Sequence, residues 1–69
     1  MTTKFGTILK NLRNDRDISQ ERLAEEIHVS HGIISLWENG LREPTLSNLI
    51  ALANHFGVSI DYLAGLKDY

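Results

Sequence analysis

Hydrogen-bonding side chains recur on one side of the segment from His31 to Asn39. His31 and Ser35 are four residues apart, so a helix places both on one face, where an imidazole and a hydroxyl can each donate or accept. Leu36 lies beside them and offers an apolar contact. The edges of DNA bases in the major groove present hydrogen-bonding groups and the thymine methyl, which such a face would match. Without supporting motifs, however, a short polar helix face is better explained by contact with water.

The sequence offers no set of residues for catalysis or metal binding. It has three histidines, no cysteine and no phosphate loop, so nucleophile, base and orienting group do not occur together. His28 and His31 are close enough to suggest a metal pair, but His55 is distant and no thiolate completes a ligand set. We therefore expect no enzyme activity, no metal and no cofactor.

The polar face requires neighbouring elements to position it, and the preceding residues predict them. Apolar residues recur at helical spacing on both sides of a short break at residues 28–30. Two short helices joined so closely must cross steeply, so a residue no larger than Ala24 is needed at the crossing. Val29 is the expected apolar plug of the turn, and the Ser30 hydroxyl is expected to cap the second helix. The apolar positions are Leu23, Ala24, Ile27, Ile34 and Trp37.

Five helices and no strand are predicted along the chain, which makes the fold all-α. We expect helices over about 3–15, 20–27 and 31–39, a fourth between Thr45 and Gly57, and a short fifth between Ser59 and about Gly65. Ser19, Thr45 and Ser59 are the expected N-caps of the second, fourth and fifth helices, and Gly40 follows the third. The expected inward positions outside the second and third helices are Phe5, Ile8, Leu9, Leu12, Leu46, Leu49, Ile50, Ala53, Phe56, Ile60 and Leu63.

Length and composition indicate one small globular domain, covering residues 1–69. A chain of 69 residues buries only about 60% of its unfolded surface. Apolar residues make up 42% and charged residues 23%, with no membrane-spanning run and no leader, so the expected compartment is the cytoplasm. A chain of this size is either a complete small protein or the binding portion of a larger one.

The net charge of −2 is unfavourable for attraction to a polyanion. No acidic residue occurs from His28 to Trp37, so we expect the polar face to be neutral to weakly basic. We expect few phosphate contacts and weak non-specific affinity for DNA. The acidic residues expected on the far side are Asp15, Asp17, Glu21, Glu25 and Glu26.

The segment 20–40, QERLAEEIHVSHGIISLWENG, resembles the phage repressor and Cro family of helix-turn-helix domains, also called the xenobiotic-response-element type. The resemblance extends over nearly the whole chain. It includes WENG at 37–40, the loop with Pro44, and ALANHFGVSIDYLAGL at 51–66. Three such blocks in order are far more specific than one short match. The resemblance implies a compact five-helix, repressor-like DNA-binding domain, whose second and third helices form the helix-turn-helix and whose third helix enters the major groove.

The resemblance also implies roles for residues outside the polar face. Gln20, at the start of the second helix, matches the position that meets a phosphate, and Asn39 and Arg42 match the loop that contacts the DNA backbone. Gly32 replaces the longer polar residue of many relatives and allows only close approach. The predicted DNA-binding set is Gln20, Ser30, His31, Gly32, Ser35, Leu36, Asn39 and Arg42.

Two further family positions concern architecture. Arg13 and Glu38 correspond to a pair of charges that is often buried, which would hold the third helix against the first. The alternative for them is two exposed charges of little energetic consequence. His28 stands where the family's turn often has a left-handed glycine, a conformation that histidine tolerates better than most residues.

The leading hypothesis is a sequence-specific DNA-binding transcriptional regulator, in particular a repressor, that binds a pseudo-palindromic operator. Its expected partners are double-stranded DNA and a second copy, bound weakly through the C-terminal segment with Tyr62, Leu66 and Tyr69. The alternative is a protein-interaction module, such as an antitoxin or an anti-repressor adaptor, with little DNA affinity. The acidic net charge and the small Gly32 support that alternative.

Overall fold

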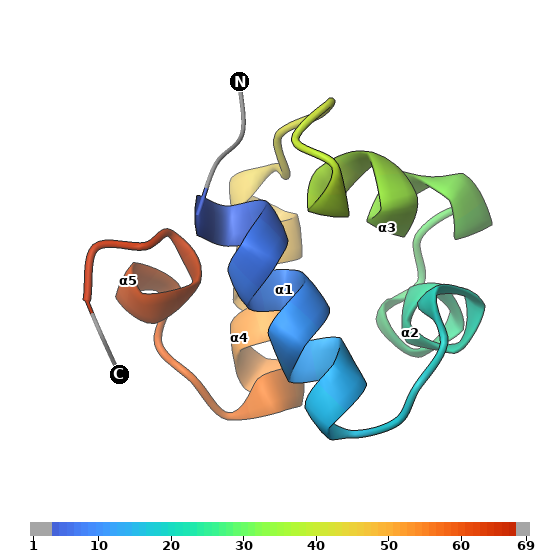
Figure 1. Ribbon diagram of the computed structural model, residues 1–69, viewed down its shortest axis with the longest axis horizontal. Helices are drawn as coiled ribbons and strands as arrows, with labels where there is room; N and C mark the ends of the chain where they lie inside the picture. Colours follow the sequence, from blue (N-terminus) through green and yellow to red (C-terminus); the bar gives the residue numbers. More distant parts are fainter. Residues whose placement is uncertain (1–3, 68–69) are drawn as a thin grey trace.

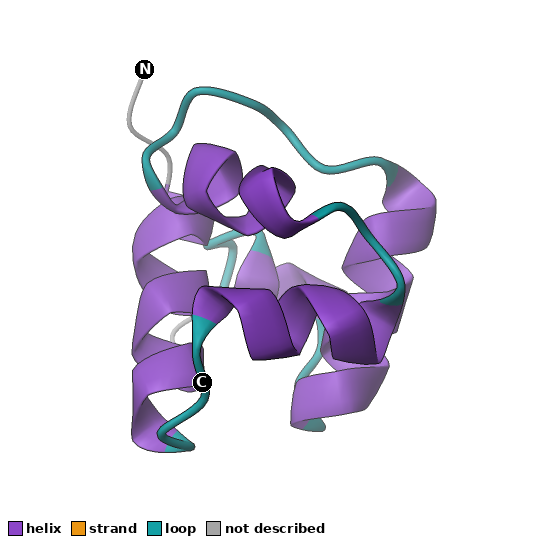
Figure 2. Ribbon diagram, turned by 90° about the vertical axis from the view of Figure 1, so that its right-hand side faces the viewer, coloured by secondary structure: helices purple, strands orange, loops and turns teal. Residues whose placement is uncertain are grey.

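The computed structural model describes residues 4–67 as five helices joined by short loops (Figure 1). They are α1 (Lys4–Asp15), α2 (Gln20–Ile27), α3 (His31–Glu38), α4 (Leu46–Phe56) and α5 (Ile60–Leu63). No strand occurs in this part of the chain, which Figure 2 shows from the side of α2 and α3. The all-α prediction is confirmed, and the third helix ends one residue before its expected end at Asn39. The expected start of the first helix, Thr3, lies outside the described residues.

Capping residues explain where most of these helices begin. The hydroxyls of Ser19, Thr45 and Ser59 each accept a hydrogen bond from a backbone N–H three residues later. Each bond satisfies one of the amides that a helix start leaves without a partner. All three caps were predicted from residue type and position.

Left-handed residues mark where the helices end. His28 has φ 63° at the end of α2, as predicted, and Gly57 has φ 68° at the end of α4. Gly40, just after α3, has φ 72°. Asp17 also has positive φ, at 54°, in the loop between α1 and α2, which was not predicted. An aspartate tolerates this conformation better than most side chains.

The hydrophobic core lies where all five helices meet. Ala24 is fully buried, as the steep α2–α3 crossing requires, and Val29 packs against the core as the expected plug of the turn. The rings of Phe5 and Trp37 meet edge to face, with centroids 6.1 Å apart. The buried apolar residues are Phe5, Leu9, Leu23, Ala24, Ile34, Trp37, Leu52, Ala53, Phe56 and Leu63.

The inward face expected for α4 was partly wrong. Leu46 is 67% exposed and Ile50 is 44% exposed, whereas Leu52, which was not expected inside, is fully buried. The helix carries two overlapping apolar stripes, and the one that packs follows the spacing i, i+3, i+4 and i+7 from Leu49. Leu46 and Ile50 belong to the other stripe and remain in water.

Close backbone contact between α1 and α3 positions the helix-turn-helix. A Cβ atom on Gly6 would lie 2.7 Å from the carbonyl oxygens of both Trp37 and Glu38. Only glycine therefore allows α1 to lie this close to the last turn of α3. In Figure 1, α1 runs between the α2–α3 pair on one side and α5 on the other.

Candidate nucleic-acid interface

The predicted polar face of α3 is present on the surface. Ile34 and Trp37 are buried at 0% and 1% exposure, so the opposite side of the helix is turned away from the core. On that side the His31 side chain is 59% exposed. Ser35 and Leu36 are half-buried rather than open. The exposed members of the predicted set around α3 are Ser30, His31, Gly32 and Asn39.

A shallow surface hollow joins this face to the start of α2. It is lined by Arg13 from α1, by Ser19, Gln20 and Glu21 at the start of α2, and by His31, Gly32 and Ser35 from α3. The structure thus brings Gln20, predicted from its place in α2, next to the residues predicted from the face of α3. Asn39 adds to the same face, because its amide donates to the Ser35 hydroxyl at 3.3 Å.

The charge distribution around this hollow differs from the expectation. Glu21 lines the hollow, and the Glu25 carboxylate lies 3.5 Å from Nε2 of His31. The prediction that the acidic side chains of α2 all lie on the far side was therefore wrong. Glu21 and Glu25 are four residues apart, so they share one face of α2, and the crossing angle turns that face toward the start of α3.

Arg13, Glu38 and Gln20 form one hydrogen-bonded network at the hollow, which Arg13 and Gln20 line. Nε and Nη2 of Arg13 donate to the two carboxylate oxygens of Glu38 at 2.7 and 3.1 Å. Nη1 of Arg13 donates to the carbonyl oxygen of Ile18 at 2.9 Å. The two side chains are only 12% and 3% exposed, so the predicted buried ion pair is confirmed. Gln20 joins the network because its Nε2 donates to Oε1 of Glu38 at 3.0 Å.

Ser30 stands at the N-cap of α3 but does not cap it with its side chain. Its backbone is extended, as at a cap, yet its hydroxyl makes no hydrogen bond to the α3 amides. The expectation that this hydroxyl would accept from them was therefore wrong. The carbonyl oxygen of Ser30 instead accepts from the amide of Ile33 at 3.2 Å. The hydroxyl is left at the surface, beside the start of the polar face.

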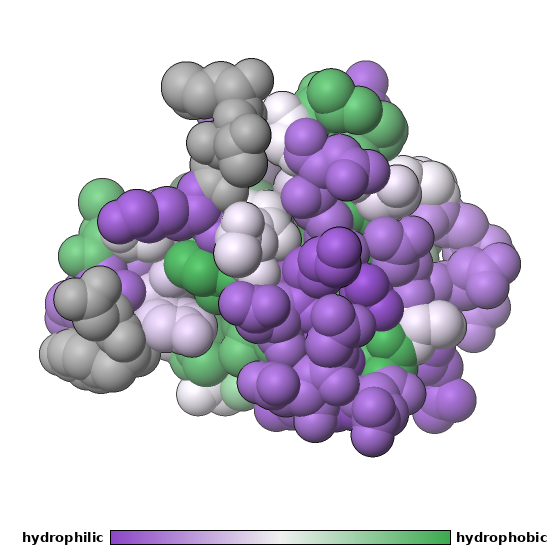
Figure 3. Space-filling model, in the orientation of Figure 1, coloured by the Kyte–Doolittle hydropathy of each residue, from purple (hydrophilic) through white to green (hydrophobic). Residues whose placement is uncertain are grey.

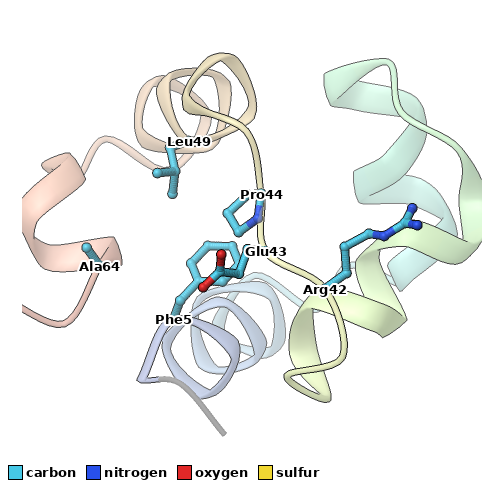
Figure 4. A pocket seen from close by; sticks show the side chains of 6 residues that line it. All are labelled: Phe5, Arg42, Glu43, Pro44, Leu49 and Ala64. Atoms are coloured by element: carbon cyan, nitrogen blue, oxygen red, sulfur yellow. The ribbon is translucent and has the colours of Figure 1, made fainter. Parts of the chain in front are cut away.

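Arg42 is exposed in the loop after α3. It lines the rim of a second hollow, together with Phe5, Glu43, Pro44, Leu49 and Ala64. Figure 4 shows the Arg42 side chain extending away from the other five labelled side chains, toward the side of the view where α2 and α3 are drawn. The side chain is therefore available to an external partner.

Comparison with known protein families identifies the family that has this arrangement of helices. A family model described as helix-turn-helix matches residues 9–63. The chain belongs to this helix-turn-helix family. The match includes α2, α3, α4 and α5 in full. The phage repressor and Cro resemblance found in the sequence is confirmed.

Solved helix-turn-helix structures have the same architecture. The P22 c2 repressor, crystallised in complex with a synthetic operator, superposes with a TM-score of 0.85 at 33% identity, over 91% of this chain and 96% of that one. The restriction-modification controller protein C.AhdI from Aeromonas hydrophila gives a TM-score of 0.80 at 31% identity, over 90% of this chain and 94% of that one. Both likenesses extend across nearly the whole of each chain.

Curated relatives in the helix-turn-helix family are mostly longer proteins. The transcriptional activator BcrR of Enterococcus faecalis is 38% identical over 60 residues, which is 87% of this chain and 29% of BcrR. The transcriptional regulator ImmR of Bacillus subtilis is 33% identical over 88% of this chain and 48% of ImmR. The CTXphi repressor RstR of Vibrio cholerae is 34% identical over 81% of this chain and 50% of RstR. This chain therefore spans about half of these relatives, or less.

Sequence reasoning missed a polar cluster that connects α2 to the end of α4. The Glu26 carboxylate accepts from Nε of Arg22 at 2.7 Å and is hydrogen-bonded to Nε2 of His55. The hydrogen bond from Arg22, then the one with His55, holds the pKa of Glu26 below its ordinary value. The i, i+4 spacing of Arg22 and Glu26 was a local signal, but nothing in the sequence pointed to His55.

Arg16 was also missed. It donates to the carbonyl oxygens of His55 and Phe56 at 2.9 and 3.1 Å, where the last turn of α4 leaves carbonyls without helical partners. Its guanidinium also lies 4.9 Å from the centre of the Phe56 ring. This cation therefore stabilises α4 rather than the polar face of α3.

Two other features of residues 4–67 bear on the class of site. No cluster of three or more His, Cys, Asp or Glu in this range has the arrangement to hold a metal ion. No helix in this range is long and apolar enough to cross a membrane.

Proposed function

We propose that this chain is the DNA-binding domain of a transcriptional regulator, and that α3 enters the major groove. The observation that carries the proposal is the exposed polar face of α3, opposite the buried Ile34 and Trp37. The same fold in the P22 c2 repressor was crystallised on operator DNA. Residues 1–69 make one such domain in this proposal, with no enzyme activity and with the cytoplasm as its compartment.

The proposed contacts divide into two groups. His31, Ser35 and Leu36 read base edges, because they project from the surface of α3 that would lie in the groove. The second group fixes the position of α3 by contacting the sugar-phosphate backbone and carries no direct sequence information. It consists of Gln20, Ser30, Asn39 and Arg42. Gly32 has no side chain to place in either group, and its proposed role is close approach of the α3 backbone to DNA.

Gln20 is suited to a phosphate contact despite its bond to Glu38. One N–H of its amide is donated to Glu38, and the second N–H is left to donate. Gln20 also lies in the first turn of α2, where backbone amides and the helix dipole favour an anion. The buried Arg13–Glu38 pair thus orients the side chain that we assign to the phosphate.

We propose repression through a pseudo-palindromic operator, with two copies associating weakly through the C-terminal segment. Leu66 is 76% exposed and Tyr62 is half-buried, so this segment presents apolar surface. Tyr69, the third expected contact, lies outside the described residues. Two half-sites roughly 34 Å apart match one turn of DNA. Hydrophobic side chains near α5 are visible at the left of Figure 3.

Sedimentation tests this arrangement. It should show a weak dimer that the substitution Leu66→Ser weakens further. A tight dimer whose stability does not change with Leu66→Ser would contradict the arrangement.

Salt-dependent binding to duplex DNA tests the DNA-binding proposal. The protein should bind mixed genomic DNA with an affinity that falls as salt rises, because phosphate contacts release counterions. Selection from a random-sequence duplex pool at fixed salt should then yield a two-fold symmetric site. A protein that binds no duplex at low salt would refute the proposal and favour a protein-interaction module.

A further inference from the structure

Gly32 has no structural reason to be glycine within the fold. It is the second residue of α3 and does not have the positive φ that favours glycine. A Cβ atom built on Gly32 meets no heavy atom of the described residues within 4 Å. Glycine weakens a helix relative to alanine, because it loses more backbone freedom on folding. The start of α3 therefore bears an energetic disadvantage that no internal contact requires.

The other four glycines each have an internal reason. A side chain on Gly6 would collide with the backbone of α3, as described above. Gly40, Gly57 and Gly65 have φ of 72°, 68° and 80°, which side chains disfavour. Gly32 alone among the five glycines has neither a close neighbour nor a left-handed backbone.

The place of Gly32 on the surface suggests an external reason. It lines the hollow between α2 and α3, with Gln20 on one side and His31 and Ser35 on its own helix. The missing side chain leaves room on the surface that α2 and α3 share at this hollow. A methyl group at this position would project into that room without touching the protein.

We propose that Gly32 is a specificity-determining residue, and that a nucleotide of the operator occupies the space a side chain would fill. This inference rests on the proposed DNA-binding function of the same face. It assigns the contact to close approach of the α3 backbone rather than to a side-chain hydrogen bond. The operator is then selected by which nucleotides can lie against the helix at this position. A side chain here would exclude those nucleotides.

The inference predicts effects of opposite sign on stability and on binding. Gly32→Ala should raise the Tm, by less than the about 4–8 °C expected for a full glycine-to-alanine gain in the helix interior of a domain of this size, because Gly32 lies in the first turn of α3. The same variant should bind the selected operator at least about 10-fold more weakly, a loss comparable to one base contact. A position that was merely solvated would show the first effect without the second.

The experiment compares Gly32→Ala with Gly32→Leu and with Asn54→Ala. Asn54 is exposed on α4, so its replacement by alanine improves helix propensity away from the hollow. All four proteins are assayed for Tm and for binding to a duplex selected by the wild-type protein from a random pool. We expect Gly32→Leu to bind more weakly than Gly32→Ala, and Asn54→Ala to bind as the wild type does. The salt dependence should be unchanged in all three variants, because none removes a phosphate-binding cation.

The results distinguish failure of the inference from failure of the proposed function. If the wild type binds and Gly32→Ala binds equally well, the close-approach inference is refuted while the proposed function stands. If Gly32→Ala lowers the Tm, the glycine serves the fold and the inference is again refuted. If the wild-type protein binds no duplex, the proposed function fails first, and this inference fails with it.

Discussion

The guanidinium of Arg13 and the carboxylate of Glu38 are joined by two hydrogen bonds and lie almost entirely out of water. The pair connects the last turns of α1 and α3 directly. Since Glu38 also accepts from Gln20, one buried carboxylate sets the relative positions of the three helices that build the proposed interface. Two charges buried together are tolerated because each satisfies the hydrogen-bonding capacity of the other.

Replacing Glu38 by alanine should therefore destabilise the protein strongly. The substitution leaves Arg13 buried without its partner, which typically costs about 3 to 5 kcal/mol. Urea unfolding monitored by circular dichroism gives the measurement. Glu25→Ala is the control, because that carboxylate is 62% exposed and should contribute almost nothing. Equal urea midpoints for the two variants would contradict a structural role for the buried pair.

Arg42→Ala should weaken binding to the operator and to unrelated DNA by similar factors. Arg42 is exposed in the loop after α3 and is proposed to contact a phosphate, which carries no sequence information. The slope of log affinity against log salt should become shallower by about one unit. Binding titrations at several salt concentrations measure both quantities. Relaxed base preference in this variant would instead place Arg42 in a groove.

His31→Ala should reduce the preference for the operator over unrelated DNA by about 1 to 3 kcal/mol, as expected for a side chain that contacts a base. Competition between the two duplexes at fixed salt measures this difference. The control is Asn54→Ala on α4, which should leave the preference unchanged. Full retention of specificity by His31→Ala would remove His31 from the interface.

Glu25→Gln should strengthen binding to any duplex, because it removes a negative charge close to His31 on the side proposed to face DNA. The matched control is Asp61→Asn, which removes a carboxylate on α5. Affinity at low salt is the measurement, since screening hides such effects at high salt. An equal gain from both substitutions would indicate a net-charge effect without a preferred face.

Some of the features behind these predictions follow from the sequence alone, and others follow only from the tertiary structure. Local chemistry determined the helix boundaries, because Ser19, Thr45 and Ser59 satisfy amides within their own turn of chain. The left-handed His28 was expected from the family resemblance, because it stands where the family's turn often has glycine. Helical periodicity also separated the outward side of α3 from the buried Ile34 and Trp37, but it did not predict that Ser35 and Leu36 would be half-buried.

Only the tertiary structure decided which apolar face of α4 packs into the core. It also decided which side chains distant in sequence come into contact. Two apolar stripes on α4 were equally compatible with its sequence, and packing against the other helices chose Leu52 over Leu46 and Ile50. The approach of Glu25 to His31 depends on the angle at which α2 crosses α3. The cluster of Glu26 and His55 likewise forms between residues 29 positions apart. Periodicity and capping act within a few residues, whereas these contacts follow from the simultaneous packing of all five helices, which no short segment specifies.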